Sequence, residues 1–220
     1  MNAAPNRDIE TIRLKGLVRY GDALRMQRER RAAVEQGLKG NALFLLEHAP
    51  VITLGVKAEQ GHILGSSEEL AAAGVEVCES DRGGDVTYHG PGQLVAYPVL
   101  DLTLWRPSIR WYLRALEEVV IRQLACYGLE AGRREGFTGV WVADTKVAAI
   151  GVSIHQWVTC HGVALNVDPD MAHFGLIVPC GIADRPVGSL KELLGQAPTM
   201  AQAMDDFERE FRAHFAREGA

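Results

Sequence analysis

The sequence lacks the features that mark membrane, secreted and nucleic-acid-binding proteins. No run of apolar residues approaches the ~18 needed for a membrane span, and the polar residues 1–8 contain no apolar stretch like that of a signal peptide. Its 23 Lys and Arg side chains are outnumbered by 28 Asp and Glu, so the net charge of -5 leaves no excess of positive charge to attract nucleic acid or an anionic membrane. We therefore expect a cytoplasmic protein that binds neither.

Cysteine is scarce as well. The four cysteines in 220 residues form no Cys-x-x-Cys pair and stand at Cys78, Cys126, Cys160 and Cys180. In a reducing compartment, these cysteines are not expected to form a disulfide framework, and a zinc cage is not indicated. Internal repeats, low-complexity tracts and Pro/Gly/Ser linkers are also missing, so we predict one domain over residues 1–220. A reactive thiol is the cysteine chemistry that remains to be considered.

Strand-like and helix-like patterns alternate along the chain. Residues 12–20, 43–47 and 51–54 are typical of short β-strands, and the charged segment from about 22 to 38 is typical of a helix. Residues 139–143, 146–154 and 160–167 are again strand-like, with short polar turns between them, and predict a meander. Such turns favour an α+β fold with a mixed, largely antiparallel sheet over a doubly wound parallel sheet. We expect helices to cover one face of this sheet.

Two segments predict long helices with an apolar stripe. The first opens at Pro107 and Ser108, and Gly128 suits its C-terminal cap. Its stripe follows the helical spacing at Ile109, Tyr112, Leu113, Leu116 and Val120. The second opens at Thr199 with Gln202 three residues later, and its stripe contains Met204, Phe207, Phe211 and Phe215. We expect both stripes to pack in the core.

The glycine-rich stretch at residues 82–93 is a candidate binding loop. It reads Arg-Gly-Gly-Asp-Val-Thr-Tyr-His-Gly-Pro-Gly-Gln between two strand-like runs. Glycine lets backbone N–H groups approach a ligand, while Thr87, Tyr88 and His89 supply hydrogen-bonding side chains. The alternative interpretation is a tight hairpin with bulges. The spacing matches neither a phosphate-binding Gly-x-x-x-x-Gly-Lys loop nor a dinucleotide-binding Gly-x-Gly-x-x-Gly loop, so a nucleotide is not indicated.

Cys180 is a candidate nucleophile because Pro179 and Gly181 flank it and leave its sulfur room to stand clear of the backbone. A thiol with a pKa of about 8.5 needs a neighbouring cation or base to ionise at neutral pH. Lys146, at the start of an apolar run, is one candidate, and His89 and His161 are rival bases. The alternatives are a buried structural cysteine, a solvated turn lysine and hydrogen-bonded structural histidines. The other three cysteines are interpreted as buried structural residues.

Four ordered blocks resemble the lipoyl(octanoyl) transferase family of lipoate biosynthesis. They are residues 82–93, Thr145-Lys-Val-Ala-Ala-Ile-Gly151, His161-Gly-Val-Ala-Leu-Asn-Val167 and Pro179-Cys-Gly181. The resemblance implies a fold like that of the biotin and lipoate protein ligases, with Cys180 as the acyl-thioester nucleophile and Lys146 as the residue that tunes it. It further implies that the substrate is bound by Arg82, Gly83, Gly84, Asp85, Val86, Thr87, Tyr88, His89, Ala149, Ile150, Gly151, Gly162, Val163 and Ala164.

The same resemblance implies a reaction and its partners. An octanoyl group would pass from octanoyl-acyl carrier protein, through a cysteine thioester, to the lysine of apo lipoyl domains in dehydrogenase E2 subunits and the glycine cleavage H protein. No cofactor or metal is implied, and we expect a monomer. Arg25, Arg28, Arg30 and Arg31 would form a docking patch for acidic partners or, alternatively, part of a solvated charged helix face.

Three other functions fit parts of the sequence. An ATP-dependent lipoate or biotin ligase would not need Cys180, and a non-catalytic module would hold acyl or lipoyl carriers without chemistry. A papain-like hydrolase requires a histidine well after its cysteine, and His214, in the expected terminal helix, is the one histidine that follows Cys180.

Overall fold

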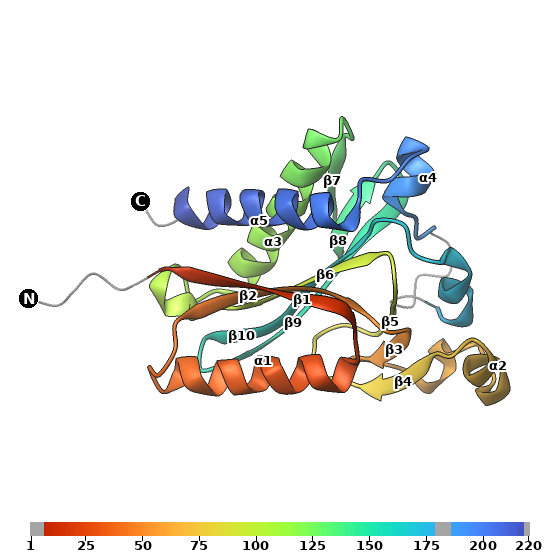
Figure 1. The fold of residues 1–220 in the computed structure, drawn as a ribbon, viewed down its shortest axis with the longest axis horizontal. Helices are drawn as coiled ribbons and strands as arrows, with labels where there is room; N and C mark the ends of the chain where they lie inside the picture. Colours follow the sequence, from red (N-terminus) through yellow and green to blue (C-terminus); the bar gives the residue numbers. More distant parts are fainter. Residues whose placement is uncertain (1–6, 179–185, 218–220) are drawn as a thin grey trace, which may run out of the picture.

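The computed structural model describes residues 7–178 and 186–217 (Figure 1). Within these ranges, seven strands form a large sheet in the order β1 (Ile9–Val18), β2 (Asn41–His48), β6 (Gln93–Val99), β10 (Val158–Asn166), β9 (Thr145–His155), β8 (Phe137–Val142) and β7 (Ala131–Arg134). In the same part of the chain, three short strands form a small sheet in the order β4 (Glu76–Glu79), β3 (Val51–Leu54) and β5 (Val86–His89).

Helices connect these strands throughout the described ranges. The α-helices are α1 (Tyr20–Glu35), α2 (Ser67–Ala72), α3 (Ile109–Cys126), α4 (Leu190–Leu194) and α5 (Met200–Arg217). Short 3-10 helices occur at η1 (Gln60–His62), η2 (Leu102–Leu104) and η3 (Met171–Leu176). None of the helices in the described residues is both long and apolar enough to cross a membrane.

The sheets are mixed and largely antiparallel, which confirms the predicted fold class. β1 runs parallel to β2 and β3 runs parallel to β4, while the other strand pairs are antiparallel. β8, β9 and β10 form the predicted meander, with Gly162 of β10 opposite Gly151 of β9. Short connections of this kind join antiparallel neighbours, whereas each parallel pair here is separated by a helix.

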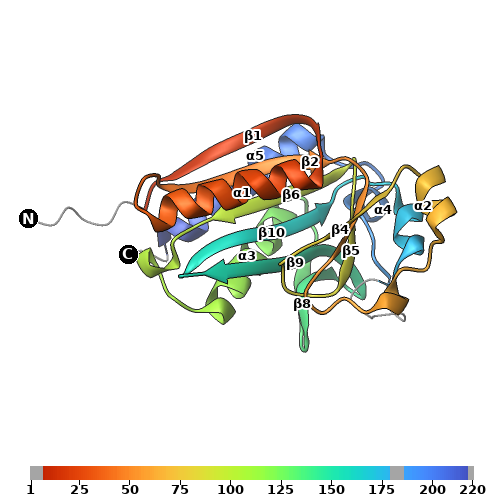
Figure 2. The same ribbon diagram turned by 90° about the horizontal axis from the view of Figure 1, so that it is seen from below.

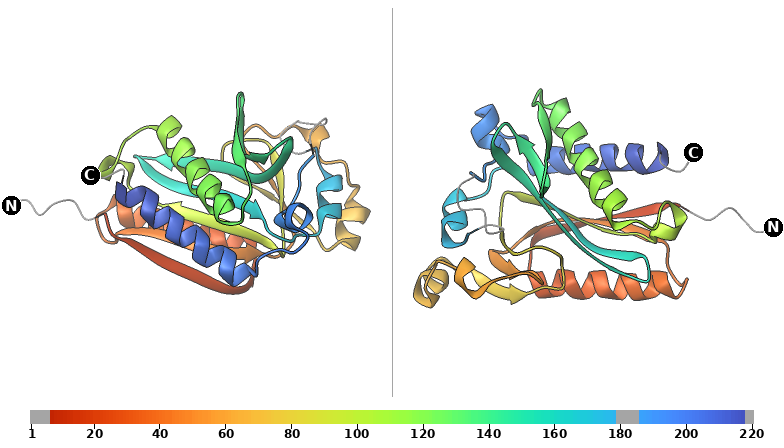
Figure 3. Two further views of the ribbon diagram at one scale, coloured as in Figure 1. Left: turned by 90° about the horizontal axis from the view of Figure 1, so that it is seen from above. Right: turned by 180° about the vertical axis from the view of Figure 1, so that it is seen from behind.

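Helices cover both faces of the large sheet, so the expectation of one covered face is wrong. α3 and α5 lie together on one face and α1 crosses the other, as the views from above and below show (Figures 2 and 3). The physical reason is visible in β2, where successive side chains point to opposite faces and both sets are buried. Leu43 and Leu45 face α3 and α5, while Ala42, Phe44 and Leu46 face α1. A continuous apolar run of this kind is typical of a strand buried on both sides.

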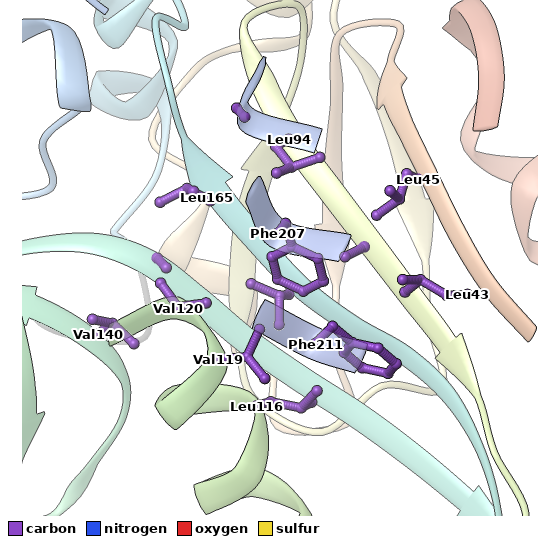
Figure 4. Close-up of a cluster of buried hydrophobic side chains, with 14 of the residues drawn as sticks. Leu43, Leu45, Leu94, Leu116, Val119, Val120, Val140, Leu165, Phe207 and Phe211 are labelled. Carbon is purple, nitrogen blue, oxygen red and sulfur yellow. The ribbon is translucent and has the colours of Figure 1, made fainter. Parts of the chain in front are cut away.

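The core on the α3 and α5 face is the larger one. Phe207 and Phe211 of α5 lie over the sheet beside Leu116 and Val119 of α3 (Figure 4). Each of these four side chains has 0% exposure. Fully burying an apolar side chain of this size stabilises a fold by roughly 1.5–3 kcal/mol. The expectation that the α5 stripe packs in the core is confirmed.

The ends of α3 and α5 follow their predicted chemistry. Ser108 accepts a hydrogen bond from the Trp111 N–H at 3.3 Å, and Thr199 accepts one from the Gln202 N–H at 3.2 Å. Each bond satisfies one of the N–H groups that a helix start leaves without a backbone partner. After α3, Gly128 has a φ of 77°, the left-handed conformation that ends many helices.

The α3 stripe divides into a core part and a surface part. Tyr112, Leu116 and Val120 are fully buried, as expected. Ile109 is 53% exposed, and both Ile109 and Leu113 line a cavity instead of the core. Residues four apart lie on the same side of a helix, so Ile109 and Leu113 both face the cavity while the rest of the stripe faces the core.

Candidate functional site

A cavity of about 730 Å³ lies where β9 and β10 of the large sheet meet the glycine-rich stretch and β5 of the small sheet. Thirteen of the sixteen predicted site residues line it. They are Arg82, Gly83, Gly84, Asp85, Thr87, His89, Lys146, Ala149, Ile150, Gly151, Gly162, Val163 and Ala164. Three separate stretches of sequence therefore meet around one space large enough for a small-molecule ligand.

Val86 and Tyr88 do not line this cavity. Both lie on β5, where they alternate with Thr87 and His89, and their side chains belong to a buried cluster with Phe174. The Tyr88 hydroxyl is 2.8 Å from Nδ1 of His173, also away from the cavity. Because successive side chains of a strand point to opposite faces, β5 brings Thr87 and His89, but not these two side chains, to the predicted site.

The turn at residues 82–85 is held against both sheets by backbone hydrogen bonds. On one side, Gly83 donates to the Val152 carbonyl of β9 at 2.9 Å. On the other, Gly55 donates to the Asp85 carbonyl at 3.1 Å and residues 56 and 57 bond the same turn. The approach to β9 requires glycine, because a Cβ on Gly151 would lie 2.8 Å from the Gly83 carbonyl oxygen. Hydrogen bonds thus tie this part of the cavity wall to both sheets, and β5 and β6 lie in different sheets instead of forming the tight hairpin of the alternative interpretation.

Arg82 places a fixed positive charge in this wall. Its side chain is buried, with Nε 3.1 Å and Nη2 2.8 Å from Thr53 Oγ1, and Nη2 also donates to the Thr53 carbonyl at 2.6 Å. These bonds hold the planar guanidinium to β3. A buried cation of this kind disfavours protonation of the histidines around it.

His89 is a buried, neutral member of a hydrogen-bond network. Its Nδ1 is 2.7 Å from Gln93 Oε1, while Gln93 Nε2 donates to the Tyr88 carbonyl and to Asn166 Oδ1. Since that amide nitrogen donates twice, its oxygen is the acceptor and His89 carries its proton on Nδ1. Burial, with His48 and Arg82 nearby, lowers the pKa of His89 well below its ordinary value.

His161, the other rival base, has an unusual backbone. Its φ of 60° is left-handed, which is uncommon for a residue other than glycine, and its ring is almost fully buried in the cavity wall. Nε2 donates to Asp81 Oδ1 at 3.2 Å. This bond, helped by Arg28 and Ser153, lowers the pKa of Asp81. Burial lowers the pKa of His161 despite the bond to Asp81, so the ring is neutral at pH 7.

Lys146 reaches the cavity from the start of β9. Its side chain is 7% exposed, and Nζ lies 5.7 Å from the ring centre of Trp141. The side chain passes over Gly139, where a Cβ would come within 2.7 Å of Lys146 Cε. The lysine stem is thus drawn into the sheet and its end lies in the wall, instead of in a solvated turn.

Cys180 lies outside the described residues, and the chain on either side of residues 179–185 contacts the cavity. The Val178 N–H donates to the carbonyl of His62 at 2.9 Å, and the Lys146 N–H donates to the Pro186 carbonyl at 3.0 Å. His62 and Lys146 both line the cavity. The residue before this segment and the residue after it are therefore each bonded to the cavity wall.

The other cysteines are not candidates for an activated thiol. Cys160 is buried as expected, and burial raises its pKa to about 11. Cys78 is partly buried in β4, and burial raises its pKa as well. Cys126 is exposed, so the expectation of a buried residue is wrong there. It lies in the last turn of α3, with its sulfur 3.5 Å from Nη2 of Arg209 at the surface.

The arginines of α1 are engaged in ion pairs. Arg30 is buried and bonds Glu10 at 2.5 Å, while Arg28 bonds Asp81 at 3.0 Å. Arg31 approaches Glu35 and Arg25 bonds Asp22, both on the same helix. Two of these pairs lie within α1 and two join it to other segments, which is closer to the alternative interpretation of a charged helix face than to an open docking patch.

Several cavity residues were not predicted. Lys57, Glu59 and His62 contribute charged or polar groups, and Ile109, Leu113 and Phe137 contribute apolar surface. His62 follows a glycine in a short 3-10 helix, with no motif around it. Within the described ranges, no three His, Cys, Asp or Glu side chains gather into a metal site.

Known proteins resemble this chain in both sequence and structure. A family model described as the lipoyl protein ligase A/B catalytic domain matches residues 19–212. An octanoyltransferase of Chloroflexus aurantiacus is 51% identical over 211 residues, which cover 94% of this chain and 95% of that protein.

Solved structures share the fold at low identity. A bi-partite lipoate protein ligase of Thermoplasma acidophilum superposes with a TM-score of 0.66 at 15% identity, covering 94% of this chain and 83% of that one. The biotin protein ligase of Aquifex aeolicus superposes with a TM-score of 0.59 at 12% identity, covering 94% of this chain and 71% of that one. The predicted likeness to the lipoate and biotin ligase fold is confirmed.

Proposed function

This chain belongs to the lipoyl protein ligase A/B catalytic domain family and is an acyltransferase that transfers octanoyl groups to lipoyl domains, and from that premise we propose its route and its partners. The octanoyl donor is octanoyl-acyl carrier protein. The group passes through a thioester on Cys180, with Lys146 as the proton-transferring partner. The acceptors are the apo lipoyl domains of dehydrogenase E2 subunits and the glycine cleavage H protein. The enzyme acts as a monomer in the cytoplasm.

One observation carries the assignment of Cys180 and Lys146. The backbone of Lys146 is bonded to Pro186 and Gly188, which follow the segment that contains Cys180, and the side chain of Lys146 lines the cavity. At the other end, Val178 is bonded to His62 of the same cavity, two residues before Cys180 in the sequence. Chain connectivity thus supports a nucleophile that works at this cavity and close to this lysine.

The first half of the reaction is a thioester exchange. The Cys180 thiolate, with the Lys146 ammonium beside it, attacks the carbonyl carbon of the octanoyl thioester. The bond to the carrier sulfur then breaks, and that sulfur leaves as a thiol with the proton of Lys146. A thioester replaces a thioester, so this half is nearly thermoneutral and requires no ATP.

The second half makes an amide. The lipoyl-domain lysine attacks the Cys180 thioester as a neutral amine, and neutral Lys146 accepts one proton from the attacking nitrogen. Collapse of the tetrahedral intermediate releases the Cys180 thiolate and restores the Lys146 ammonium. Preorganised backbone N–H groups can stabilise the oxyanion by about 3 kcal/mol each.

The acyl chain has an apolar surface to occupy. Ile109, Leu113 and Phe137 line the cavity on the α3 and β8 side, and Ile150 and Val152 line it on β9. Each methylene removed from water contributes about 0.8 kcal/mol, so an eight-carbon chain gains much more from this surface than a short one. This supports a medium-chain acyl group as the transferred unit.

Intact-protein mass spectrometry tests the thioester route. Incubation with octanoyl-acyl carrier protein should add one octanoyl mass to the wild type, hydroxylamine should remove it, and C180A should gain none. Substitution K146A should form the acyl-enzyme at least about 100-fold more slowly, the usual scale of general acid–base assistance. C126S is the matched control, because Cys126 is exposed and does not line the cavity. Octanoyl transfer that persists in C180A would refute the route.

A further inference from the structure

A proton of the proposed reaction still lacks an acceptor. The lipoyl-domain lysine arrives as an ammonium with three protons, because its amine has a pKa of about 10.4 in water, and it ends as an amide nitrogen with one proton. Two protons therefore leave that nitrogen. Lys146 takes one of them and returns to the state in which it began. The other requires a second base in contact with the cavity and with a path to solvent.

His62 has the geometry for this second role. It ends η1 in the cavity wall, its side chain is 22% exposed, and its Nδ1 is buried 2.5 Å from Asp85 Oδ2, an ion-pair distance at which the angles do not form a hydrogen bond. The Asp85 carboxylate is fixed in turn, since its Oδ1 accepts the Val86 N–H at 2.7 Å. A carboxylate beside Nδ1 favours the tautomer with its proton on Nδ1, which leaves Nε2 as the nitrogen that accepts a proton.

The backbone around His62 is bonded to the residues that precede the segment containing Cys180. The backbone carbonyl of His62 accepts the Val178 N–H, Ile63 forms a β-bridge with Ile177, and Leu64 donates to the Leu176 carbonyl at 2.8 Å. Residues 62–64 are thus joined to residues 176–178. The backbone of Lys146 is bonded to Pro186 and Gly188, which follow the segment containing Cys180.

The charges around His62 suit the approach of the positively charged lysine of a lipoyl domain. Asp85 lies at Nδ1, and Glu59 Oε2 is 3.9 Å from Nε2. The cations Lys57, Arg82 and Lys146 line other parts of the cavity wall. Two carboxylates beside a partly exposed imidazole attract a lysine ammonium to it.

We propose that His62 is the base that removes the first proton from the lipoyl-domain lysine, with Asp85 as its positioning residue. This inference rests on the proposed Cys180 thioester. The ammonium gives a proton to Nε2 of His62, the neutral amine attacks the thioester carbon, and Lys146 takes the second proton from nitrogen as the Cys180 thiolate leaves. His62 then releases its proton to solvent through its exposed edge. Lys146 thereby accepts a single proton in this half and returns to the ammonium form with which the reaction began.

The two half-reactions separate this role from a structural one. H62Q should form the octanoyl-enzyme from octanoyl-acyl carrier protein at the wild-type rate, as measured by rapid-quench intact mass. Single-turnover transfer from the isolated octanoyl-enzyme to an apo lipoyl domain should be slower by about 100-fold or more at pH 7. D85N should slow the same step by a smaller factor. H155Q is the matched control, because His155 also contacts a carboxylate, that of Glu35, but lies outside the cavity.

The pH dependence gives a second readout. The pH profiles of transfer by the wild type and by H62Q should differ in shape, because H62Q has no imidazole to accept the proton. The deficit of H62Q should shrink toward pH 10, where the acceptor lysine loses its proton in solution. Added imidazole should restore part of the transfer rate of H62A.

Each remaining outcome overturns the proposal in a recognisable way. Equal slowing of both half-reactions in H62Q, or wild-type transfer by H62Q at pH 7, removes His62 as the base while leaving the Cys180 thioester intact. A wild type that gains no octanoyl mass refutes the thioester route itself, and the role of His62 with it.

Discussion

Acid should destabilise the fold through its buried histidines, and His48 sets the size of the effect. This side chain has 0% exposure, with Nδ1 2.8 Å from the Val18 carbonyl and Nε2 2.8 Å from the Tyr97 hydroxyl. Burial lowers the pKa of His48 to about 4, although the bond to Val18 opposes the shift. A histidine in the unfolded chain has a pKa of about 6.5, so the unfolded state binds more protons between these two values.

The direction and magnitude follow from this difference. A pKa that folding lowers leaves stability intact above the unfolded pKa, and stability is lost as the pH falls toward the folded pKa. At about 1.4 kcal/mol per pKa unit, the full loss from His48 is about 3 kcal/mol, of which about 2 kcal/mol falls between pH 7 and pH 5. That is a large share of the roughly 5–15 kcal/mol that stabilises a typical domain.

Urea unfolding followed by circular dichroism at pH 7, 6 and 5 measures this loss. H48Q should be less stable than the wild type at pH 7, because it loses a buried hydrogen bond. Its further decline between pH 7 and pH 5 should be smaller than that of the wild type by about 2 kcal/mol. Protonation of His89, whose pKa is also lowered, should cause part of the loss of stability in both proteins. H155Q, with a ring 60% exposed, should follow the wild type, and parallel curves for H48Q and the wild type would refute the reasoning.

Three further substitutions test the core and the cavity. G151A brings a Cβ to 2.8 Å from the Gly83 carbonyl oxygen and should lower kcat/KM for octanoyl transfer at least about 10-fold. G132A, whose Cβ would have no atom within 4 Å, should leave kcat/KM unchanged. Equal effects of the two substitutions would contradict the fixed turn. F211A should lower the free energy of unfolding by about 3–5 kcal/mol in urea titrations, and a loss below 1 kcal/mol would show that this part of the core is poorly packed. L113A should lower kcat/KM for an octanoyl donor about 10-fold more than for a butyryl donor, and an equal loss for both would remove this side chain from the acyl surface.

The sequence predicted best the elements that its local periodicity defines. The strand expected at residues 51–54 is β3, and the helix expected after Ser108 is α3, because strand and helix signals were present within each segment. The small sheet was not predicted as a unit. Its strand β4 pairs in parallel with β3 across the intervening α2, and β4 is largely exposed, so neither alternation nor spacing marked the partnership.

The candidate site was predictable to the extent that its residues lie in contiguous blocks. The glycine-rich stretch, Lys146 and residues 149–151 and 162–164 were identified through the family resemblance, and the fold brings them to one cavity. The alternation of β5 excludes Val86 and Tyr88 from that wall, which is a consequence of strand geometry that the block alone did not reveal. His62 could not be found in this way, because its importance depends on a contact with Asp85 that is 23 positions away in the sequence.

Val163 belongs to two environments at once. It is 1% exposed and packs in the core beneath α3 and α5, yet it also lines the cavity. Only the thickness of one strand separates the acyl-binding space from the hydrophobic interior at this point. An engineer who trims this side chain to admit longer fatty acids also withdraws support from the helices above it, so broadened chain-length selectivity and heat resistance will trade against each other in this scaffold.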